Sequence, residues 1–285
     1  MSVAWLLNLE ADLELQRPTY QPSPAVERRL GTLRSQVLEL VRPGDVVVEP
    51  GVRADGRAGV SWCPTPQALA RLRRAGAEPI PSPGFEVLQR VNHRRFCADL
   101  GQTLPGGRWC TSLGEVEGQL ESGVATTGVW LLKRPFSFSG SARRRVTLSR
   151  GGLDDDLRRW VTASLREDGL QVEPWMRRSL DVVLHGWVGT EVRLGAICTQ
   201  VCDARGAWQT TRLGAELSSE EARALGVEAE RAARALEEAG YWGPFAVDGF
   251  RYEGGFCSRV EINARYTMGW AVGLPLRPDM AMVGS

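Results

Sequence analysis

Lysine and histidine are the scarce residues of this chain. Its 285 residues include 35 basic side chains, yet Lys133 is the one lysine, and the two histidines are His93 and His185. With only two histidines, Ser-His or Cys-His nucleophilic catalysis has little to work with, and their separation in the sequence argues against a zinc site. The preference for arginine mostly reflects codon composition, so the position of the single lysine is more informative than the bias itself.

The cysteines and the charge balance exclude further classes of protein. The six cysteines form no CxxC pair, which argues against a zinc site or a disulfide framework and favours small buried thiols. The 35 basic residues nearly balance 34 acidic ones, for a net charge of +1. We therefore expect no broad surface for nucleic acid or for anionic membranes, although a local basic patch is compatible with these numbers.

Long hydrophobic runs are absent as well. No apolar stretch approaches the length of a membrane span. Residues 1–15 contain a short apolar run, but no basic region precedes it and Glu10, Asp12 and Glu14 follow it, which is not the layout of a signal peptide. From these absences we expect a cytoplasmic protein.

What is present is an ordinary globular composition, 43% hydrophobic and 24% charged, of a length that suits one large domain or two modest ones. In the first third, strand patterns at 3–9 and 45–49 alternate with helices that begin at Ser23-Pro24 and Thr65-Pro66. Such alternation predicts a small parallel sheet. We assign residues 1–84 to an amino-terminal α/β domain.

The pattern changes after a predicted helix at 85–100 and a cluster of glycine and proline at 104–108. Ser218 and Glu221 form a capping box for one of two further helices, the other spanning about 154–168. Eight strands are predicted between and around these helices, at 129–133, 145–148, 170–173, 180–187, 191–201, 207–212, 245–252 and 256–262. Residues 85–285 therefore form a larger α+β region.

The last two predicted strands form a hairpin with Gly254-Gly255 as its turn. A turn centred there pairs Asp248 with Glu261, with Cβ atoms about 5 Å apart, and places Asn263 on the face of Glu261. Two carboxylates and an amide oxygen form a ligand set suited to Mg²⁺. The alternative is a surface hairpin whose acids pair with one of the nearby arginines, Arg251, Arg259 or Arg265.

Two other strand ends carry polar side chains. Lys133 ends an apolar strand before a loop of serine, phenylalanine and glycine, where an ammonium and backbone N–H groups can meet phosphates; a solvated lysine gives the same pattern. Glu173 is followed by Met176 and Asp181. An acid beside a hinge backbone can bind an adenine amino group and a second acid can bind ribose hydroxyls, but plain surface acids are equally compatible.

In their order, these pieces resemble the ATP-grasp superfamily over roughly residues 85–269. The segment Val260-Glu261-Ile262-Asn263-Ala264-Arg265 resembles the E-x-N metal motif of that family, with Asp248 as the preceding aspartate. Lys133 is similar to the strand lysine that binds nucleotide phosphates, and Ser139 and Gly140 lie in the loop that closes over them. The resemblance implies a mobile nucleotide-binding subdomain at about 105–176 and a metal-binding subdomain at 177–285, with the nucleotide between them.

The resemblance also implies roles for the remaining candidates. Glu173 and the Met176 backbone would bind adenine, and Asp181 would bind ribose. Arg193 and Arg265 would hold the γ-phosphate or an acyl phosphate. The loop has one glycine where many members of the family have several, and Arg94 is the nearest counterpart of the family's earlier nucleotide lysine.

The activity implied by the resemblance is that of a ligase dependent on ATP and on Mg²⁺ or Mn²⁺. It would join a small-molecule or peptide carboxylate to an amine, or less often a thiol, through an acyl phosphate; dimers are common among relatives. Two alternatives stay open, a non-catalytic ATP-binding protein and a kinase that acts on a hydroxyl. The run Arg143-Arg144-Arg145 could meet an acidic peptide or polyanion, or form a solvated strand edge.

Overall fold

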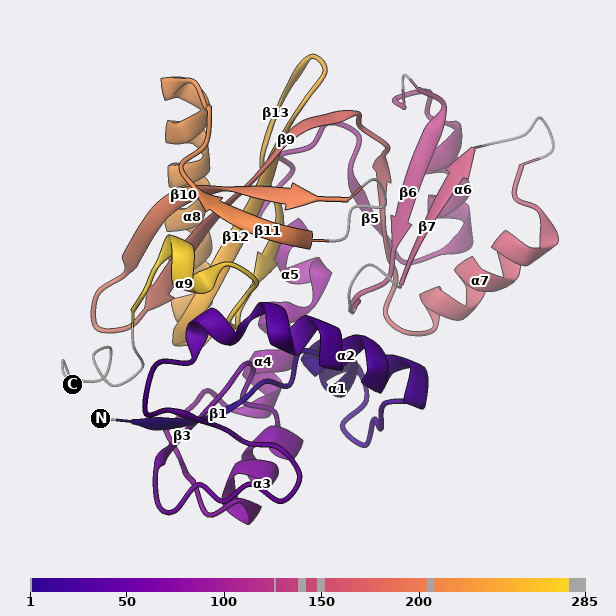
Figure 1. Cartoon of the computed structure of the whole chain (residues 1–285). Coiled ribbons are helices and arrows are strands. Elements are labelled where there is room, and N and C mark those ends of the chain that lie inside the picture. The colour runs from indigo at the N-terminus through magenta and orange to yellow at the C-terminus, as the bar shows by residue number, and fades with distance from the viewer. Residues whose placement is uncertain (1, 126, 138–141, 148–151, 204–207, 277–285) are drawn as a thin grey trace.

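The structure, a computed structural model, describes residues 2–125, 127–137, 142–147, 152–203 and 208–276. Its strands form three separate sheets (Figure 1). None of the described helices has the length and apolar character needed to cross a membrane.

The first sheet is parallel, as the alternation of strands and helices predicts. Its strand order is β2-β1-β3-β4. The two predicted helix starts are confirmed, because the side chains of Ser23 and Thr65 each accept a hydrogen bond from the third following backbone N–H. The elements of this region are β1 (Val3–Leu6), α1 (Ala11–Gln16), α2 (Pro24–Gln36), the 3₁₀ turn η1 (Leu38–Leu40), β2 (Val46–Val47), β3 (Ala58–Ser61), α3 (Pro66–Arg74) and β4 (Glu78–Pro79).

The linker to the second sheet is two short helices rather than the one helix predicted for 85–100. They are α4 (Phe85–Asn92) and α5 (Arg94–Asp99). His93 separates them, because its backbone is extended and its side chain caps α5 by accepting from the N–H of Arg95. The break directs Arg94 toward the sheets that follow.

The second sheet is antiparallel, in the order β5-β8-β6-β7. Its inner face packs on α6 and α7 through Trp130, Leu132 and Val172. Since side chains alternate along a strand, Leu131, Lys133 and Glu173 lie on the other face. The elements are β5 (Arg108–Cys110), α6 (Leu113–Glu121), β6 (Val129–Lys133), β7 (Arg143–Thr147), α7 (Asp155–Leu165) and β8 (Leu170–Pro174), of which β5 and α6 are not among the predicted elements.

The third sheet is the largest, with the order β11-β10-β9-β12-β13. Helix α8 packs against β9, β12 and β13, and begins with the predicted capping box of Ser218 and Glu221. Its elements are β9 (Arg178–Val188), β10 (Arg193–Cys202), β11 (Trp208–Leu213), α8 (Ser219–Glu238), β12 (Gly243–Tyr252), β13 (Gly255–Asn263) and the short α9 (Trp270–Gly273).

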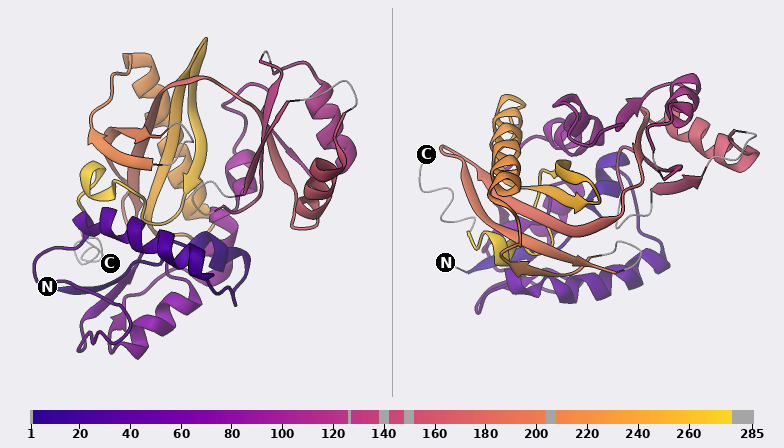
Figure 2. Two further views of the ribbon diagram at one scale, coloured as in Figure 1. Left: turned by 45° about the vertical axis from the view of Figure 1, so that its right-hand side comes forward. Right: turned by 90° about the horizontal axis from the view of Figure 1, so that it is seen from above.

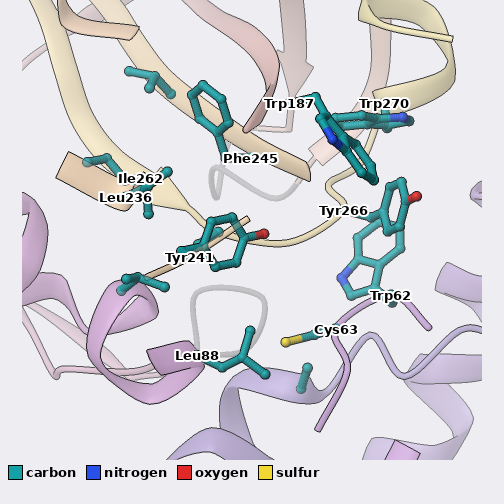
Figure 3. Close-up of a cluster of buried hydrophobic side chains, with 14 of the residues drawn as sticks. Trp62, Cys63, Leu88, Trp187, Leu236, Tyr241, Phe245, Ile262, Tyr266 and Trp270 are labelled. Atoms are coloured by element: carbon teal, nitrogen blue, oxygen red, sulfur yellow. The ribbon is translucent and has the colours of Figure 1, made fainter. Parts of the chain in front are cut away.

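One core joins the first sheet to the third. Tyr266 packs edge-on against both Trp5 and Trp270, with ring centroids 5.2 Å apart in each pair. Trp62 and Cys63 of the first region belong to the same buried cluster (Figure 3). The second sheet has a core of its own and stands beside this unit (Figure 2). The space between them is where the candidate site lies.

Candidate functional site

The pairing of Asp248 with Glu261 is confirmed, although the predicted turn is wrong. Tyr252 pairs with Gly255, so the turn is Glu253-Gly254, one position earlier than expected. The register then shifts between Asp248 and Phe250, because one residue of β12 faces three of β13. Gly249 allows this bulge, since a Cβ there would lie 2.9 Å from the carbonyl oxygen of Cys257.

Asp248 is held from two sides. Its Oδ1 accepts a hydrogen bond from Gln200 Nε2 at 3.0 Å, and its Oδ2 accepts from Asn263 Nδ2 at 3.0 Å. Burial, followed by the charge of Glu261, raises the pKa of Asp248 to about 7. The carboxyl group therefore exchanges its proton with solvent near neutral pH, and a bound cation could take the place of that proton.

Glu261 has the opposite electrostatic environment. Burial alone would raise its pKa, but the charges of Arg94 and Lys133 outweigh burial and hold the pKa below its ordinary value. Arg94 forms an ion pair with this carboxylate, with 3.0 Å from Nη1 to Glu261 Oε2. Glu261 is thus ionised at neutral pH, whereas its neighbour Asp248 is partly protonated.

The donor set fits a hard cation that retains outside ligands. Asp248, Glu261 and Asn263 offer only oxygen, which Mg²⁺ and Mn²⁺ accept. Among the described residues, no group of three or more His, Cys, Asp or Glu side chains is arranged to hold a metal. A cation here would therefore complete its coordination with water or with phosphate oxygens.

Lys133 and Glu173 form an ion pair across neighbouring strands of the second sheet. Glu173 is opposite Leu131 in the ladder, and Lys133 Nζ contacts Glu173 Oε1. Both residues are buried, with 6% and 4% of their surface exposed. Burial lowers the pKa of Lys133, and the Glu173 charge opposes that effect. The prediction that Glu173 is a hinge acid did not include this contact.

Arg94 reaches the same space from α5. Besides Glu261, its guanidinium donates to the carbonyl oxygen of Arg134 at 3.0 Å and to Ser137 Oγ at 2.7 Å. The arginine therefore lies between the candidate ligands Asp248, Glu261 and Asn263, which we call the metal set, and the segment that follows Lys133. This placement matches the phosphate-side role expected of Arg94, which stays a prediction.

Arg265 links the metal set to the amino-terminal region. Its guanidinium donates to Asn263 Oδ1 at 2.7 Å and to Asn92 Oδ1 at 3.2 Å, and pairs with Asp12 Oδ2 at 2.8 Å. Sequence reasoning missed Asp12, Asn92 and Gln200. The sequence carries one signal for Asp12, which is its place in the run of acids at 10–14 after the first strand. The spacing of these acids does not predict that one of them contacts residue 265.

Two cavities meet at these side chains. One, of about 330 Å³, is lined by Asp248, Asn263 and Arg265; the other, of about 240 Å³, is lined by Gln171 and Glu173. We call the pair the cleft. The residues that line both cavities are Arg94, Lys133, Val260 and Glu261.

Comparison with known proteins bears on this arrangement. No family model matches the sequence. The chain is 23% identical over 304 residues to the (butirosin acyl-carrier protein)–L-glutamate ligase of Niallia circulans, a match that covers 93% of this chain and 72% of the relative.

Two solved structures share the fold. D-alanyl-alanine synthetase A from Vibrio cholerae has a TM-score of 0.53 at 12% identity, covering 92% of this chain and 89% of its own. N5-carboxyaminoimidazole synthetase from Staphylococcus aureus, complexed with ADP, has a TM-score of 0.52 at 10% identity, covering 93% and 71%. The chain has the ATP-grasp fold.

Within this ATP-grasp fold, two of the remaining candidates lie in or beside the cleft. Asp181 of β9 lines the larger cavity and accepts a hydrogen bond from Arg178 Nη1 at 3.0 Å. Met176 packs against the buried cluster of Leu104, Phe250 and Cys257, which the cleft residue Val260 also contacts. Their predicted contacts with ribose and adenine stay predictions.

Arg193 is not brought to the cleft. It begins β10 opposite Trp187, whereas Gln200, the contact of Asp248, is seven residues further along the same strand. At about 3.3 Å per residue this separation is roughly 23 Å. Arg193 is exposed and lines neither cavity. Ser139 and Gly140 lie outside the described residues.

Proposed function

We propose that the protein is an ATP-dependent ligase that activates a carboxylate as an acyl phosphate and transfers the acyl group to an amine or a thiol. The observation that supports this proposal most strongly is the convergence in one cleft of paired acids, Asp248 and Glu261, with two cations, Lys133 and Arg94. The solved relatives include an enzyme with bound ADP.

In this proposal the nucleotide lies between the second and third sheets. Lys133 and Arg94 would face its phosphates, and Glu173, Met176 and Asp181 would lie along its nucleoside. Asp248, Glu261 and Asn263 would hold Mg²⁺ or Mn²⁺, which neutralises phosphate charge when bound. We further propose residues 1–84 as an amino-terminal domain and 85–285 as the ATP-grasp region, divided at about 176.

The side chains then act mainly by position and charge. Asp248 gives up its proton as the cation binds, while Arg94 keeps Glu261 ionised beforehand. A substrate carboxylate oxygen attacks the γ-phosphorus and ADP leaves; an amine or thiol then attacks the acyl carbon and phosphate leaves. Arg265, held by Asp12 and Asn263, would stabilise the anionic intermediate. No protein nucleophile is needed, in keeping with the scarcity of histidine.

The curated relative suggests the class of substrates. Its name describes the joining of L-glutamate to a carrier protein. We propose that this protein also takes an amino acid or a similar small carboxylate, with an acceptor presented by a larger partner.

The test follows ADP release with magnesium, ATP and a panel of carboxylates, beginning with L-glutamate. We expect Asp248→Asn and Glu261→Gln to lower turnover at least about a hundredfold, because each removes one ligand charge. Glu253→Gln, in the exposed turn of the same hairpin, is the matched control and should behave as wild type.

Three outcomes would contradict the proposal. Unchanged turnover in both site variants would refute the metal assignment. ATP that raises the melting temperature without ADP release from any substrate would indicate a non-catalytic binding protein. A phosphorylated product without free phosphate would identify a kinase.

A further inference from the structure

Helix α5 bridges the two sheets that border the cleft, and His93, the residue before it, has no role in the mechanism above. The helix contacts β13 of the third sheet and β5 and β8 of the second (Figure 1). Arg94 is its first residue, and the backbone N–H of Arg94 donates to the carbonyl oxygen of Pro135 at 3.2 Å. The start of α5 therefore fixes where the Arg94 guanidinium enters the cleft.

Helix α5 is too short to be stable without support at its ends. It has six residues, whereas isolated helices below about 12 residues are marginal in water. Its carboxyl end is held by the buried Arg259, which donates to the carbonyl oxygen of Gly101 at 2.8 Å. Its amino end is held by His93, whose Nδ1 accepts a hydrogen bond from the backbone N–H of Arg95 at 3.1 Å. The first turn of α5 therefore depends on a lone pair of the imidazole.

This cap fixes the protonation state of the imidazole. A ring nitrogen that accepts a hydrogen bond carries no proton, so the proton of the neutral ring is on Nε2. Nε2 lies 3.4 Å from Asp168 Oδ2, a carboxylate that favours a proton there. A second proton could be added only at Nδ1, where it would take the place of the bond from Arg95. Protonation of His93 and the cap on α5 therefore exclude each other.

The surroundings of the ring favour its neutral form. It packs against Trp109 of β5 and Phe136 after β6, with ring centroids 5.3 Å and 5.2 Å away. The charged groups that act on it come from the turn between α7 and β8 and from α5, and are Asp168, Arg94, Arg95 and Asp99. Burial is the largest effect and lowers the pKa of His93 below its ordinary value of 6.5, while the Asp168 charge opposes that shift. The cap is thus present at neutral pH and lost in acid.

We propose that His93 is a positioning residue for Arg94, and that protonation of its ring releases the first turn of α5 and weakens the binding of nucleotide. This inference rests on the proposed function, in which Arg94 faces the phosphates. With the cap in place, Arg94 lies 3.0 Å from Glu261 and is ordered before the nucleotide arrives. Without the cap, the nucleotide must order that turn as it binds, which reduces its apparent affinity.

Three substitutions separate the cap from the packing and the charge of the ring. His93→Asn retains an acceptor for the N–H of Arg95 but cannot be protonated, and asparagine is among the best N-cap residues. His93→Phe retains an aromatic ring beside Trp109 and Phe136 but has no acceptor. Asp168→Asn removes the charge that favours the protonated ring, at an exposed position whose left-handed backbone asparagine tolerates.

The main readout is the affinity for a non-hydrolysable ATP analogue with magnesium, titrated by calorimetry at about pH 7.5 and about pH 5. At the higher pH we expect wild type, His93→Asn and Asp168→Asn to bind alike and His93→Phe to bind about fivefold more weakly, the effect of losing one cap. At the lower pH wild type should bind about threefold more weakly than His93→Asn, with Asp168→Asn between them. Asp248 titrates in this range too, but it is common to all four proteins and cancels in the comparison.

Two further readouts need no nucleotide. At neutral pH, hydrogen exchange of the α5 amides should be faster in His93→Phe than in His93→Asn. Nitrogen-15 NMR should show His93 as the Nε2–H tautomer, and the spectrum is simple because the chain has two histidines. The other one, His185, has its pKa lowered by burial to about 4, so the titration of His93 is observed above it.

Each contrary result has a distinct meaning. A proton on Nδ1 at neutral pH, or equal affinities in His93→Asn and His93→Phe, would overturn the positioning role. Weak binding by His93→Asn with normal binding by His93→Phe would show that the ring acts by packing. Wild-type protein that gives the expected binding differences but releases no ADP with any carboxylate would refute the ligase function and leave the role of His93 intact.

Discussion

Asp248 is the residue whose protonation makes the stability of the protein depend on pH near neutrality. Its pKa of about 7 in the folded protein lies above its ordinary value near 3.8, so the folded state binds a proton that the unfolded state has already lost. In metal-free protein, the stabilisation from this proton is fully present below pH ~4 and is lost as the pH rises through about 7. A cation would replace the proton and reverse the trend.

We therefore predict that, between about pH 5 and pH 8, the melting temperature of metal-free protein falls more steeply in wild type than in Asp248→Asn. The affinity for Mg²⁺ should rise over the same range, since the cation competes with the proton. Differential scanning calorimetry in the presence of a chelator measures the first effect. Identical pH profiles of the two proteins would show that Asp248 titrates like an exposed acid.

At the scale of elements, the Lys133–Glu173 pair joins β6 to β8 at the buried face of the cleft. Removing one partner of such a pair costs about 3–5 kcal/mol, because a buried charge is left alone. In the proposed function, the ammonium group of Lys133 also faces the phosphates of the nucleotide. Arginine retains the charge but is larger, forked and planar, so the two side chains are not equivalent here.

We predict that Lys133→Met lowers the free energy of unfolding by about 3 kcal/mol, and that Lys133→Met combined with Glu173→Leu recovers most of that loss. Lys133→Arg should change it by less than about 1 kcal/mol while reducing ATP affinity at least about tenfold, because the guanidinium keeps the pair but not the position of the ammonium. Urea unfolding and nucleotide titration measure the two effects. Normal ATP affinity in Lys133→Arg would make this lysine incidental to nucleotide binding.

At this scale, the sequence predicts some helices and strand pairings correctly and misses others. Strong local signals, such as Thr65-Pro66 and the capping box at Ser218, place helix starts correctly. The predicted pairing of Asp248 with Glu261 is correct because two departures from the expected hairpin cancel. The turn lies one residue earlier than predicted, and the bulge on β13 shifts the register back. A bulge arises from close backbone packing around Gly249, which periodicity does not encode. The short α6 was missed although Ser112 and Glu115 form a capping box there.

At the scale of the whole molecule, one ion pair connects the two ends of the sequence. Asp12 and Arg265 are 253 positions apart and meet at 2.8 Å. Burial raises the pKa of Asp12, and the charge of Arg265 opposes that shift. Because Arg265 also contacts Asn263, we propose that Asp12, which lines the larger cavity of the cleft, acts as a positioning residue for the metal set.

We predict that Asp12→Asn leaves the affinity for ATP unchanged but lowers turnover about tenfold and raises the magnesium concentration needed for half-maximal activity. A purely structural role would lower the melting temperature without moving the magnesium dependence. Asp55→Asn, an exposed partner of Arg57 that lines neither cavity of the cleft, is the control. An unaltered magnesium requirement in Asp12→Asn would exclude the positioning role.

The site could be predicted from the sequence only in part, for reasons of distance along the chain. Asp248, Glu261 and Asn263 belong to one hairpin, so local register brings them together. Asp12, on α1, reaches the site through the packing of the amino-terminal region on the third sheet. Gln200 reaches it from β10, which β9 separates from β12. Single-sequence patterns specify neither arrangement. Arg193 shows the converse, since its strand was predicted correctly but Arg193 begins that strand, seven residues away from Gln200.

The core shared by the first and third sheets has a consequence for how the chain is made. Trp5 and Trp62 lie in one buried cluster with Tyr266, which is synthesised 261 residues after Trp5 and 204 residues after Trp62. While the ribosome is still translating the third sheet, this part of their cover is missing. We predict that slowing translation of the last tens of codons increases aggregation of nascent chains, measured as the insoluble fraction of newly made protein; an unchanged fraction would show that the amino-terminal sheet is sufficiently covered by its own region.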